Sequence, residues 1–179
     1  MNKEINIKNI FNSKTIPIIN FTRKGFNKEI NKIIGKLSIS GVQKKISLKI
    51  DRKKLELVTA HTLGEYILKP QLEQWEQVPE NEELCMSLAD AFQIETAEHT
   101  LIPFKGGEIA YITKRFDRVK TGKVAVEDFC QILEYKKKDK YNGSIVKIGN
   151  AIKKYSAAPG LDNLLLFRQV LFNFLISNA

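Results

Sequence analysis

The stretch that decides the fold is "KLSISGVQKKISLKI", residues Lys36 to Ile50. Two short segments with alternating apolar residues enclose a polar loop that contains one glycine and two serines, Ser38 and Ser40. Alternation with a period of two predicts strands, and a loop of small residues lets the backbone approach a ligand closely. The stretch therefore predicts either an ordinary β-hairpin or a hairpin whose loop holds phosphate groups.

The pattern of short strands continues after this loop. β-rich segments separated by turn-like residues run as far as Pro70 and predict an antiparallel meander. A helix is expected over Asn81–Phe92, with Asn81 as its cap, and a second hairpin is expected around the glycines of "KGGE". After Asp117 only helix-like patterns remain. Strands with one inserted helix, followed by helices alone, predict an α+β fold with two lobes.

These patterns divide the chain into three parts. Residues 1–36 are rich in lysine and predict an arm or short strand, followed by a helix over Arg23–Gly35. Residues 37–118 predict the β-rich lobe, and residues 119–179 predict the start of a helical lobe.

The composition is that of a soluble, globular and basic chain. Its 179 residues carry a formal net charge of +9 with a pI near 9.5, and 43% of them are hydrophobic. Such a charge favours polyanionic partners, so a nucleic-acid-binding domain is one reading of the chain. A dedicated DNA-binding helix would show a regular basic stripe with interleaved aromatic residues, and the sequence contains no such stripe.

The sequence indicates a reducing, cytoplasmic setting. Cys85 and Cys130 lie far apart in apolar helical contexts, which predicts two buried free thiols. His61 and His99 have no cysteine or histidine at the spacing of metal ligands, so we expect no zinc site. We find neither the apolar stretch of a signal peptide nor a segment that could span a bilayer, so no membrane partner is expected.

The last predicted helix, "DNLLLFRQVLFNFLIS", is apolar on more than a single stripe. A helix of this kind is expected to be buried on most sides. Either another chain or a missing C-terminal portion would cover it, and we favour the missing portion.

After the loop, a lysine at the end of a strand is followed by a glutamate on the next predicted helix. Lys69 ends a strand, and the next helix carries Glu82 and Glu83. Strand, loop, strand, lysine and acidic helix form the layout of the smaller lobe of protein kinases, in which the lysine neutralises phosphates and the glutamate holds the lysine. Helical spacing puts Glu82 toward the protein interior and Glu83 on the polar side, so Glu82 is the expected partner and Glu83 is expected in solvent.

Several separated strings strengthen this reading. The chain contains, in order, "SISGVQKKISL", "YILKP", "NEELCMSLA", "TKRFDR", "EDFCQIL", "KYNGS" and "LFNFLISNA". In this order and register they resemble the HipA family of bacterial serine/threonine kinases, which act as toxins in toxin–antitoxin pairs and are linked to persistence. The resemblance covers about Leu37 to Ala179. The short run before it and the two-serine "SIS" pattern resemble the shortened HipT toxin, whose missing N-terminal subdomain is a separate small protein.

The resemblance implies an ATP site. Backbone groups of the loop Ser38–Lys45 would cover the phosphates, and Lys114–Phe116 would be the hinge that meets adenine. Asp117 and Arg118 would be a structural pair. Autophosphorylation would fall on Ser38 or Ser40 and silence the kinase. The ATP-binding residues it implies are Ser40, Gly41, Val42, Gln43, Lys45, Lys69, Glu82, Lys114, Arg115 and Phe116.

The family pattern continues beyond Ala179 with the catalytic aspartate and the ligands of Mg²⁺. No catalytic or metal-binding residue is therefore expected within the chain, and we expect it to be inactive alone. It would be a fragment of a longer kinase, a truncated gene product, or half of a kinase completed by a second chain.

By resemblance, the target would be a protein of translation, an aminoacyl-tRNA synthetase. The partners would be a helix-turn-helix antitoxin and possibly the small N-terminal-subdomain protein, with DNA reached only through the antitoxin. The alternative is a non-catalytic, pseudokinase-like module that binds antitoxin or nucleotide.

Overall fold

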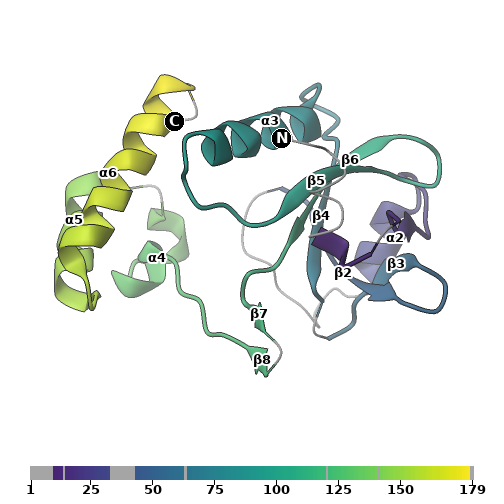
Figure 1. The fold of residues 1–179 in the computed structure, drawn as a ribbon, viewed down its shortest axis with the longest axis horizontal. Helices are drawn as coiled ribbons and strands as arrows, with labels where there is room; N and C mark the ends of the chain where they lie inside the picture. The colour runs from purple at the N-terminus through teal and green to yellow at the C-terminus, as the bar shows by residue number, and fades with distance from the viewer. Residues whose placement is uncertain are drawn as a thin grey trace. The chain divides into compact units, whose positions relative to one another are not determined.

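The computed structural model of the chain describes residues 10–13, 15–32, 43–62, 64–119, 121–140 and 142–177 (Figure 1). The chain forms two compact units, Met1–Lys120 and Thr121–Ala179. The first unit contains a sheet with helices, and the second contains mainly helices. The predicted α+β class is confirmed. The assignment of the two units to kinase lobes stays a prediction.

The first unit is built on a six-stranded sheet with the order β1-β3-β2-β4-β6-β5. Neighbouring strands are antiparallel except β1, which runs parallel to β3. The strands are β1 (Ile18–Ile19), β2 (Ile46–Asp51), β3 (Glu56–Thr59), β4 (Tyr66–Pro70), β5 (His99–Pro103) and β6 (Ile109–Lys114).

The predicted meander is wrong at one junction. β4 pairs with β2 rather than with β3, with Ile46 opposite Leu68. The connection over residues 60–65 can span about 20 Å when extended, whereas the path past β2 is only about 10 Å, or two strand spacings. The chain can therefore cross one strand and place β2 in the middle of the sheet.

One face of the sheet is apolar and packs on the N-terminal part of the chain. Alternating residues such as Leu48, Leu68 and Ile112 lie on this face and are fully buried. The helix α2 (Phe26–Asn31) is shorter than the predicted helix, whose last residues, 33–35, lie outside the described residues. The core combines segments that are distant in sequence: Ile10, Phe11, Ile19, Phe21, Phe26, Ile46, Leu48, Leu57, Tyr66, Leu68, Ile102, Phe104, Ala110 and Ile112.

The helix α3 (Val78–Ala91) packs against β5 and β6 (Figure 1). It begins three residues before the predicted start, and Gln77 is its N-cap residue. Asn81 is not the cap, because its backbone N–H already donates to the Gln77 carbonyl at 2.9 Å as part of the first turn. Pro79 suits this first turn, since its fixed φ is helical and its missing N–H would have no partner within the helix.

The second unit contains the helices predicted near the end of the chain. A small separate sheet of β7 (Arg118–Val119) and β8 (Gly122–Lys123) precedes them. The helices are α4 (Phe129–Ile132), the 3₁₀ turn η1 (Lys137–Asp139), α5 (Ile145–Tyr155) and α6 (Pro159–Leu175), and α5 packs against α6.

The "EDFCQ" string forms a helix start. The Asp128 side chain accepts from the Gln131 backbone N–H at 3.0 Å, and the Gln131 side chain accepts from the Asp128 backbone N–H at 2.9 Å. This reciprocal capping box satisfies two donors at the start of α4. The string therefore has a structural role here. The three-residue spacing of its aspartate and glutamine is the sequence pattern of a capping box.

The helix α6 is not buried on most sides within the part of the chain that the structure describes. Only Phe172 is buried, whereas large apolar side chains are exposed along the helix: Leu161, Leu164, Leu165, Phe167, Leu171, Phe174 and Leu175. That another chain or further sequence covers them stays a prediction. Among the described residues, no helix is long and apolar enough to cross a bilayer.

Candidate functional site

Lys69 and Glu82 form an ion pair between β4 and α3. The Lys69 Nζ donates to Glu82 Oε1, and the two side chains are 23% and 25% exposed. Strand alternation places Lys69 on the face that α3 covers, while its neighbours Leu68 and Pro70 turn to the core. The structure thus joins the lysine and the glutamate that the sequence singles out. Their contact with ATP stays a prediction.

Tyr111 completes the surroundings of the lysine. It is the register partner of Lys69 on β6, and the Lys69 Nζ lies 5.3 Å from the centre of its ring. A cation over an aromatic face is attracted by the negative face of the ring. Burial raises the pKa of Tyr111, and the Glu82 carboxylate adds to this, so its hydroxyl stays neutral. The ammonium is therefore held by one charged and one aromatic neighbour.

His99, which the sequence patterns did not assign to the site, lies in the same layer. It is 1% exposed at the start of β5. Its Nδ1 lies 2.8 Å from Glu83 Oε2, and its Nε2 lies 3.2 Å from Asp90 Oδ2. Burial alone lowers the pKa of His99, but the hydrogen bonds and charges of the two carboxylates outweigh it, so the net pKa is raised. The two carboxylates therefore favour the imidazolium form of His99, in which both ring nitrogens can donate.

The prediction that Glu83 is in solvent is wrong. Its carboxylate is 21% exposed and bonded to His99. The apolar side of the helix, which would be expected to face the interior, is instead turned outward at Leu84 and Phe92, each 56% exposed. The reason is that α3 covers the polar face of the sheet, so the polar side of the helix turns inward. The signal for this contact was present in sequence, since Glu83 and Asp90 are two helical turns apart and a histidine begins the next strand.

The serine-containing loop before β2 is described only at its end. Ser38, Ser40, Gly41 and Val42 lie outside the described residues, so their predicted roles stay predictions. The Gln43 side chain donates to the carbonyl of Pro70 at 3.5 Å. The end of the loop, which continues through Lys45 into β2, therefore lies next to the residue that follows Lys69.

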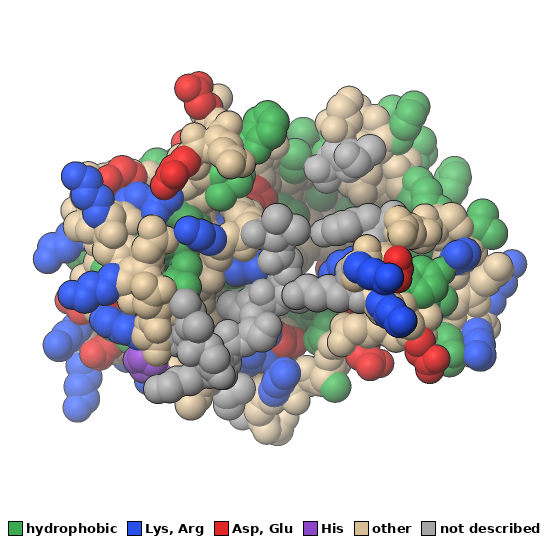
Figure 2. All heavy atoms as spheres, turned by 180° about the vertical axis from the view of Figure 1, so that it is seen from behind, with side chains coloured by type: hydrophobic (Ala, Val, Ile, Leu, Met, Phe, Trp, Pro, Cys, Tyr) green, Lys and Arg blue, Asp and Glu red, His purple; other side chains and the backbone are tan. Residues whose placement is uncertain are grey.

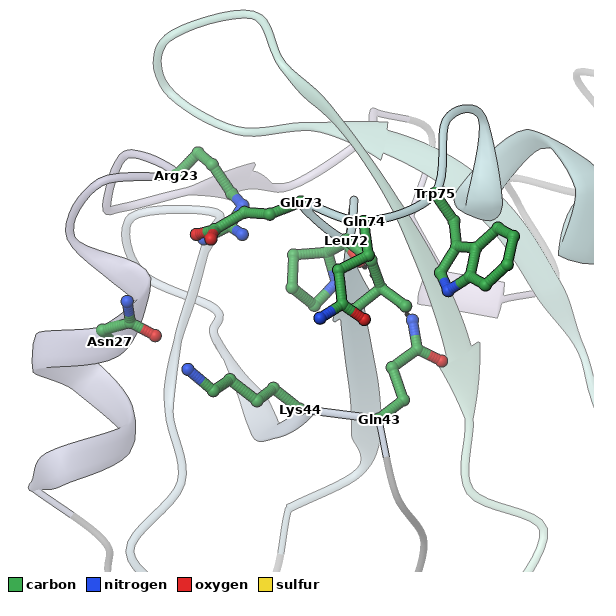
Figure 3. Close-up of a pocket in the computed structure, with 9 residues that line it drawn as sticks. Arg23, Asn27, Gln43, Lys44, Leu72, Glu73, Gln74 and Trp75 are labelled. Atoms are coloured by element: carbon green, nitrogen blue, oxygen red, sulfur yellow. Dashed lines mark hydrogen bonds between the residues drawn. The ribbon is translucent and has the colours of Figure 1, made fainter.

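A cavity of about 580 Å³ lies beside the end of this loop (Figure 3). It is lined by Arg23, Asn27, Gln43, Lys44, Pro70, Leu72, Glu73, Gln74 and Trp75. Figure 3 shows Lys44 and Asn27 on one side of it and Trp75 on the other. Neither Lys69 nor Glu82 lines it, because Pro70 turns to the α2 side of the sheet and Lys69 to the α3 side. The cavity and the ion pair are therefore separate features.

The predicted hinge, Lys114–Phe116, continues from the end of β6. The backbone N–H of Lys114 donates to Glu98 O and that of Arg115 donates to Glu65 O, each at 2.8 Å. Phe116 is 73% exposed. A base at this hinge would therefore meet carbonyl oxygens or the Phe116 backbone rather than the first two N–H groups.

Asp117 is the centre of an arginine cluster. Arg115 donates to both carboxylate oxygens at 2.8 Å, and Arg118 donates to Oδ2 at 2.6 Å. Hydrogen bonds from Arg115 outweigh the opposing effect of burial and, with Arg118, lower the pKa of Asp117 to about 2. Arg118 also donates to the carbonyl of Gly64 at 3.2 Å. The predicted pair is thus a triad that includes Arg115 of the hinge.

Among the described residues, no group of three or more His, Cys, Asp and Glu side chains could hold a metal ion. These residues therefore do not fit Mg²⁺, and no step through it is assigned to them. On the face shown in Figure 2, Lys and Arg side chains are spread over the surface with Asp and Glu among them. Cys85 and Cys130 are free but only half-buried, in contrast to the buried thiols expected.

A sheet with a helix on its polar face, and a lysine–glutamate pair between them, defines the α+β class with the layout of a kinase N-lobe. Over residues 37–179 the chain matches the family model described as "HipA-like C-terminal domain". The chain belongs to the HipA family, as the sequence motifs predicted.

The relatives agree with this assignment. Two proteins of Sinorhizobium fredii (strain NBRC 101917 / NGR234) match 80% of the chain: "Putative kinase Y4mE" is 29% identical over 153 residues, and "Putative kinase Y4dM" is 31% identical over 159 residues. A solved structure of the Shewanella oneidensis MR-1 HipA, HipB and operator DNA complex matches 86% of the chain, with 22% identity and a TM-score of 0.59. It supports the fold.

The chain spans less than half the length of each of these proteins. It covers 36% and 38% of the two Sinorhizobium proteins and 43% of the Shewanella chain.

Proposed function

We propose that this chain is the ATP-binding part of a HipA-type serine/threonine protein kinase, the toxin of a bacterial toxin–antitoxin pair. The observation that carries the proposal is the Lys69–Glu82 pair held between β4 and α3. In kinases a lysine on a strand, held by a glutamate on the adjacent helix, contacts the phosphates of ATP. The family and the kinase names of the relatives support the same reading.

Each residue of the pair has a distinct role in this proposal. Lys69 brings a positive charge to the phosphates, and its partial exposure leaves room for a ligand oxygen beside Glu82. Glu82 and the Tyr111 ring restrict the positions that the ammonium can take. Restricting it before binding lowers the entropy lost on binding. Bound ATP supplies the phosphoryl group, while these residues bind and orient it.

The remaining ATP contacts come from the loop and the hinge. Backbone N–H groups of Ser40, Gly41 and Val42 would hold phosphate oxygens, and Gln43 and Lys45 would follow at the end of the loop. Gln43 lies beside Pro70, which supports an approach of the loop to the strand of Lys69. Lys114, Arg115 and Phe116 would place the base.

The test is a calorimetric titration of the 179-residue chain with ATP and, separately, with adenosine. Each phosphate contact from a charged group contributes about 1.5–3 kcal/mol. ATP is therefore expected to bind at least ten-fold more tightly than adenosine. Equal affinities, or no saturable binding of ATP, would contradict the proposal.

Autophosphorylation of Ser38 or Ser40 is the proposed control of this site. A phosphate adds about −1.5 to −2 charges close to where the ATP phosphates would bind. The double variant Ser38→Asp, Ser40→Asp is expected to bind ATP roughly five-fold more weakly, since about 1 kcal/mol of repulsion corresponds to that factor.

The matched control for this experiment is Ser38→Asn, Ser40→Asn, which has the same side-chain size without the charge. It is expected to keep the affinity of the unmodified chain within about two-fold. If both double variants lose affinity equally, the shape of the loop matters rather than its charge, and the proposed switch fails.

The proposed partners follow from the family. The matching Shewanella structure is a complex of HipA with HipB and operator DNA. For this chain we infer a helix-turn-helix antitoxin as partner, with DNA reached through it, and a small N-terminal-subdomain protein if the toxin is HipT-like. The protein substrate would be an aminoacyl-tRNA synthetase, which places the proposed activity in the cytoplasm. Antitoxin binding without ATP binding would instead support the pseudokinase-like module.

A further inference from the structure

His99 connects two points of α3 to the sheet. Its two ring nitrogens lie 2.8 Å from Glu83 Oε2 and 3.2 Å from Asp90 Oδ2. These acidic residues are seven positions apart, so they lie on one face of the helix about 10.5 Å apart along its axis. An attachment at two points restrains both the position of a helix and its rotation about its own axis. One buried side chain therefore attaches α3 to β5 at two points.

This attachment is adjacent to the ion pair in sequence and in space. Glu82 directly precedes Glu83, so a rotation of α3 by one residue, about 100°, would exchange the two carboxylates. The His99 ring also stacks on Tyr111 with a centroid distance of 6.0 Å, and Tyr111 in turn lies under the Lys69 Nζ. The histidine and the ion pair therefore belong to one polar layer between α3 and the sheet.

We propose that His99 is a positioning residue: by holding Glu83 and Asp90 it keeps α3 at the rotation that presents Glu82 to Lys69. The link to ATP rests on the proposed function, but the positioning of the ion pair does not. The attachment needs a proton on both ring nitrogens, because carboxylate oxygens accept and a neutral imidazole has only one N–H.

The titratable groups in the same layer as His99 come from three elements. Glu82, Glu83 and Asp90 lie on α3, Tyr111 lies on β6, and Lys69 lies on β4. At the edge of the same strands, Glu98 and Lys114 pair with each other at 2.9 Å.

The attachment is expected to depend on pH. The net pKa of His99 is raised above its usual 6.5, since the two carboxylates outweigh the effect of burial. A group whose pKa is raised by folding stabilises fully below its unfolded pKa and loses this contribution as pH rises through the folded value. The attachment should therefore be complete below about pH 6.5 and weaken toward alkaline pH.

The test reads the ion pair directly. Lysine amines are acylated with a soluble ester and the products are measured by mass spectrometry. The acylation rate of Lys69 divided by that of the exposed Lys49 of β2 is the relative rate of Lys69. The Lys69 Nζ is held against Glu82 Oε1, so loss of this carboxylate should free the amine to react and raise the relative rate of Lys69. We expect about a ten-fold rise in Glu82→Gln, which corresponds to about 1.4 kcal/mol for the lost contact, and at least about a three-fold rise in His99→Gln. The double variant should react no faster than Glu82→Gln, because His99 acts through Glu82.

The control is Glu80→Gln, which removes an exposed carboxylate from the same helix and should leave the relative rate unchanged. In the unmodified chain the relative rate should also rise with pH, and in His99→Gln it should not. If His99→Gln lowers thermal stability but leaves the relative rate and its pH profile unchanged, His99 is only structural and the inference is wrong. Effects of His99→Gln and Glu82→Gln that multiply in the double variant would also overturn it.

Two further measurements keep the outcome clear. If His99→Gln does not fold, Glu83→Met carries the same expectation, because it removes the acceptor of one ring nitrogen and keeps the length of the side chain. An ATP titration of the same variants then separates the two claims. A raised relative rate of Lys69 in a chain that binds no ATP would support the positioning role and refute the proposed function.

Discussion

Replacing Lys69 with methionine is expected to weaken ATP binding by roughly 10- to 150-fold, the factor that corresponds to about 1.5–3 kcal/mol for a hydrogen bond from a charged group. Methionine keeps the length of the side chain and can still lie on the Tyr111 ring, so the sheet should remain intact. Calorimetric titration with ATP measures the effect, and circular dichroism checks the fold.

The matched control is Lys49→Met, which removes the same charge from an exposed position on β2. It should bind ATP like the unmodified chain. Glu82→Gln should weaken ATP binding by a smaller factor than Lys69→Met, because the ammonium is still present but less restrained. Equal losses in Lys69→Met and Lys49→Met would show that net charge, rather than this site, governs binding.

The second large effect is expected at Asp117. Replacement by asparagine should lower the free energy of unfolding at pH 7 by about 2–4 kcal/mol, since it leaves the nearly buried guanidinium groups of Arg115 and Arg118 without their carboxylate. Arg118 also connects the cluster to Gly64, so the damage should reach the start of β4 as well as the hinge. Urea unfolding followed by circular dichroism gives the value.

The pH dependence of this effect has a definite sign. Hydrogen bonds from Arg115, together with Arg118, depress the pKa of Asp117 to about 2, below its usual value of 3.8. The stabilisation is therefore complete above about pH 4 and is lost as pH falls through 3.8 toward 2. The difference in free energy of unfolding between the unmodified chain and Asp117→Asn should therefore shrink over this pH range.

The control for Asp117→Asn is Asp51→Asn, at the last residue of β2. Asp51 accepts from the Lys53 and Lys54 backbone N–H groups through Oδ1, and asparagine keeps this oxygen, so little stability should be lost. A loss in Asp117→Asn no larger than in this control would mean that the arginine cluster does not stabilise the fold.

Periodicity explains why much of the site was predictable. Alternation along "YILKP" places Leu68 and Pro70 in the core and Lys69 on the opposite face, whatever the neighbouring strands are. Helical spacing likewise places Glu82 on the inward side of α3, from the periodicity of that helix alone. Both inferences need only the geometry of one element, and the structure joins the two residues as the spacing indicated.

The contacts that depend on distant segments were not predictable in this way. The pairing of β4 with β2 depends on the path of a connection, and the start of α3 depends on Gln77 and Pro79 rather than on Asn81. The inward turn of Glu83 depends on His99, a residue of another strand.

By itself, the sequence indicated most of the strands and helices, the HipA family and the two residues of the ion pair, because periodicity and local motifs specify an element and the direction of its side chains. Only the tertiary structure decided that the acidic side of α3 faces inward. The physical reason is that a helix turns toward a sheet the side that complements it, and here the sheet offers a buried histidine whose two ring nitrogens contact Glu83 and Asp90.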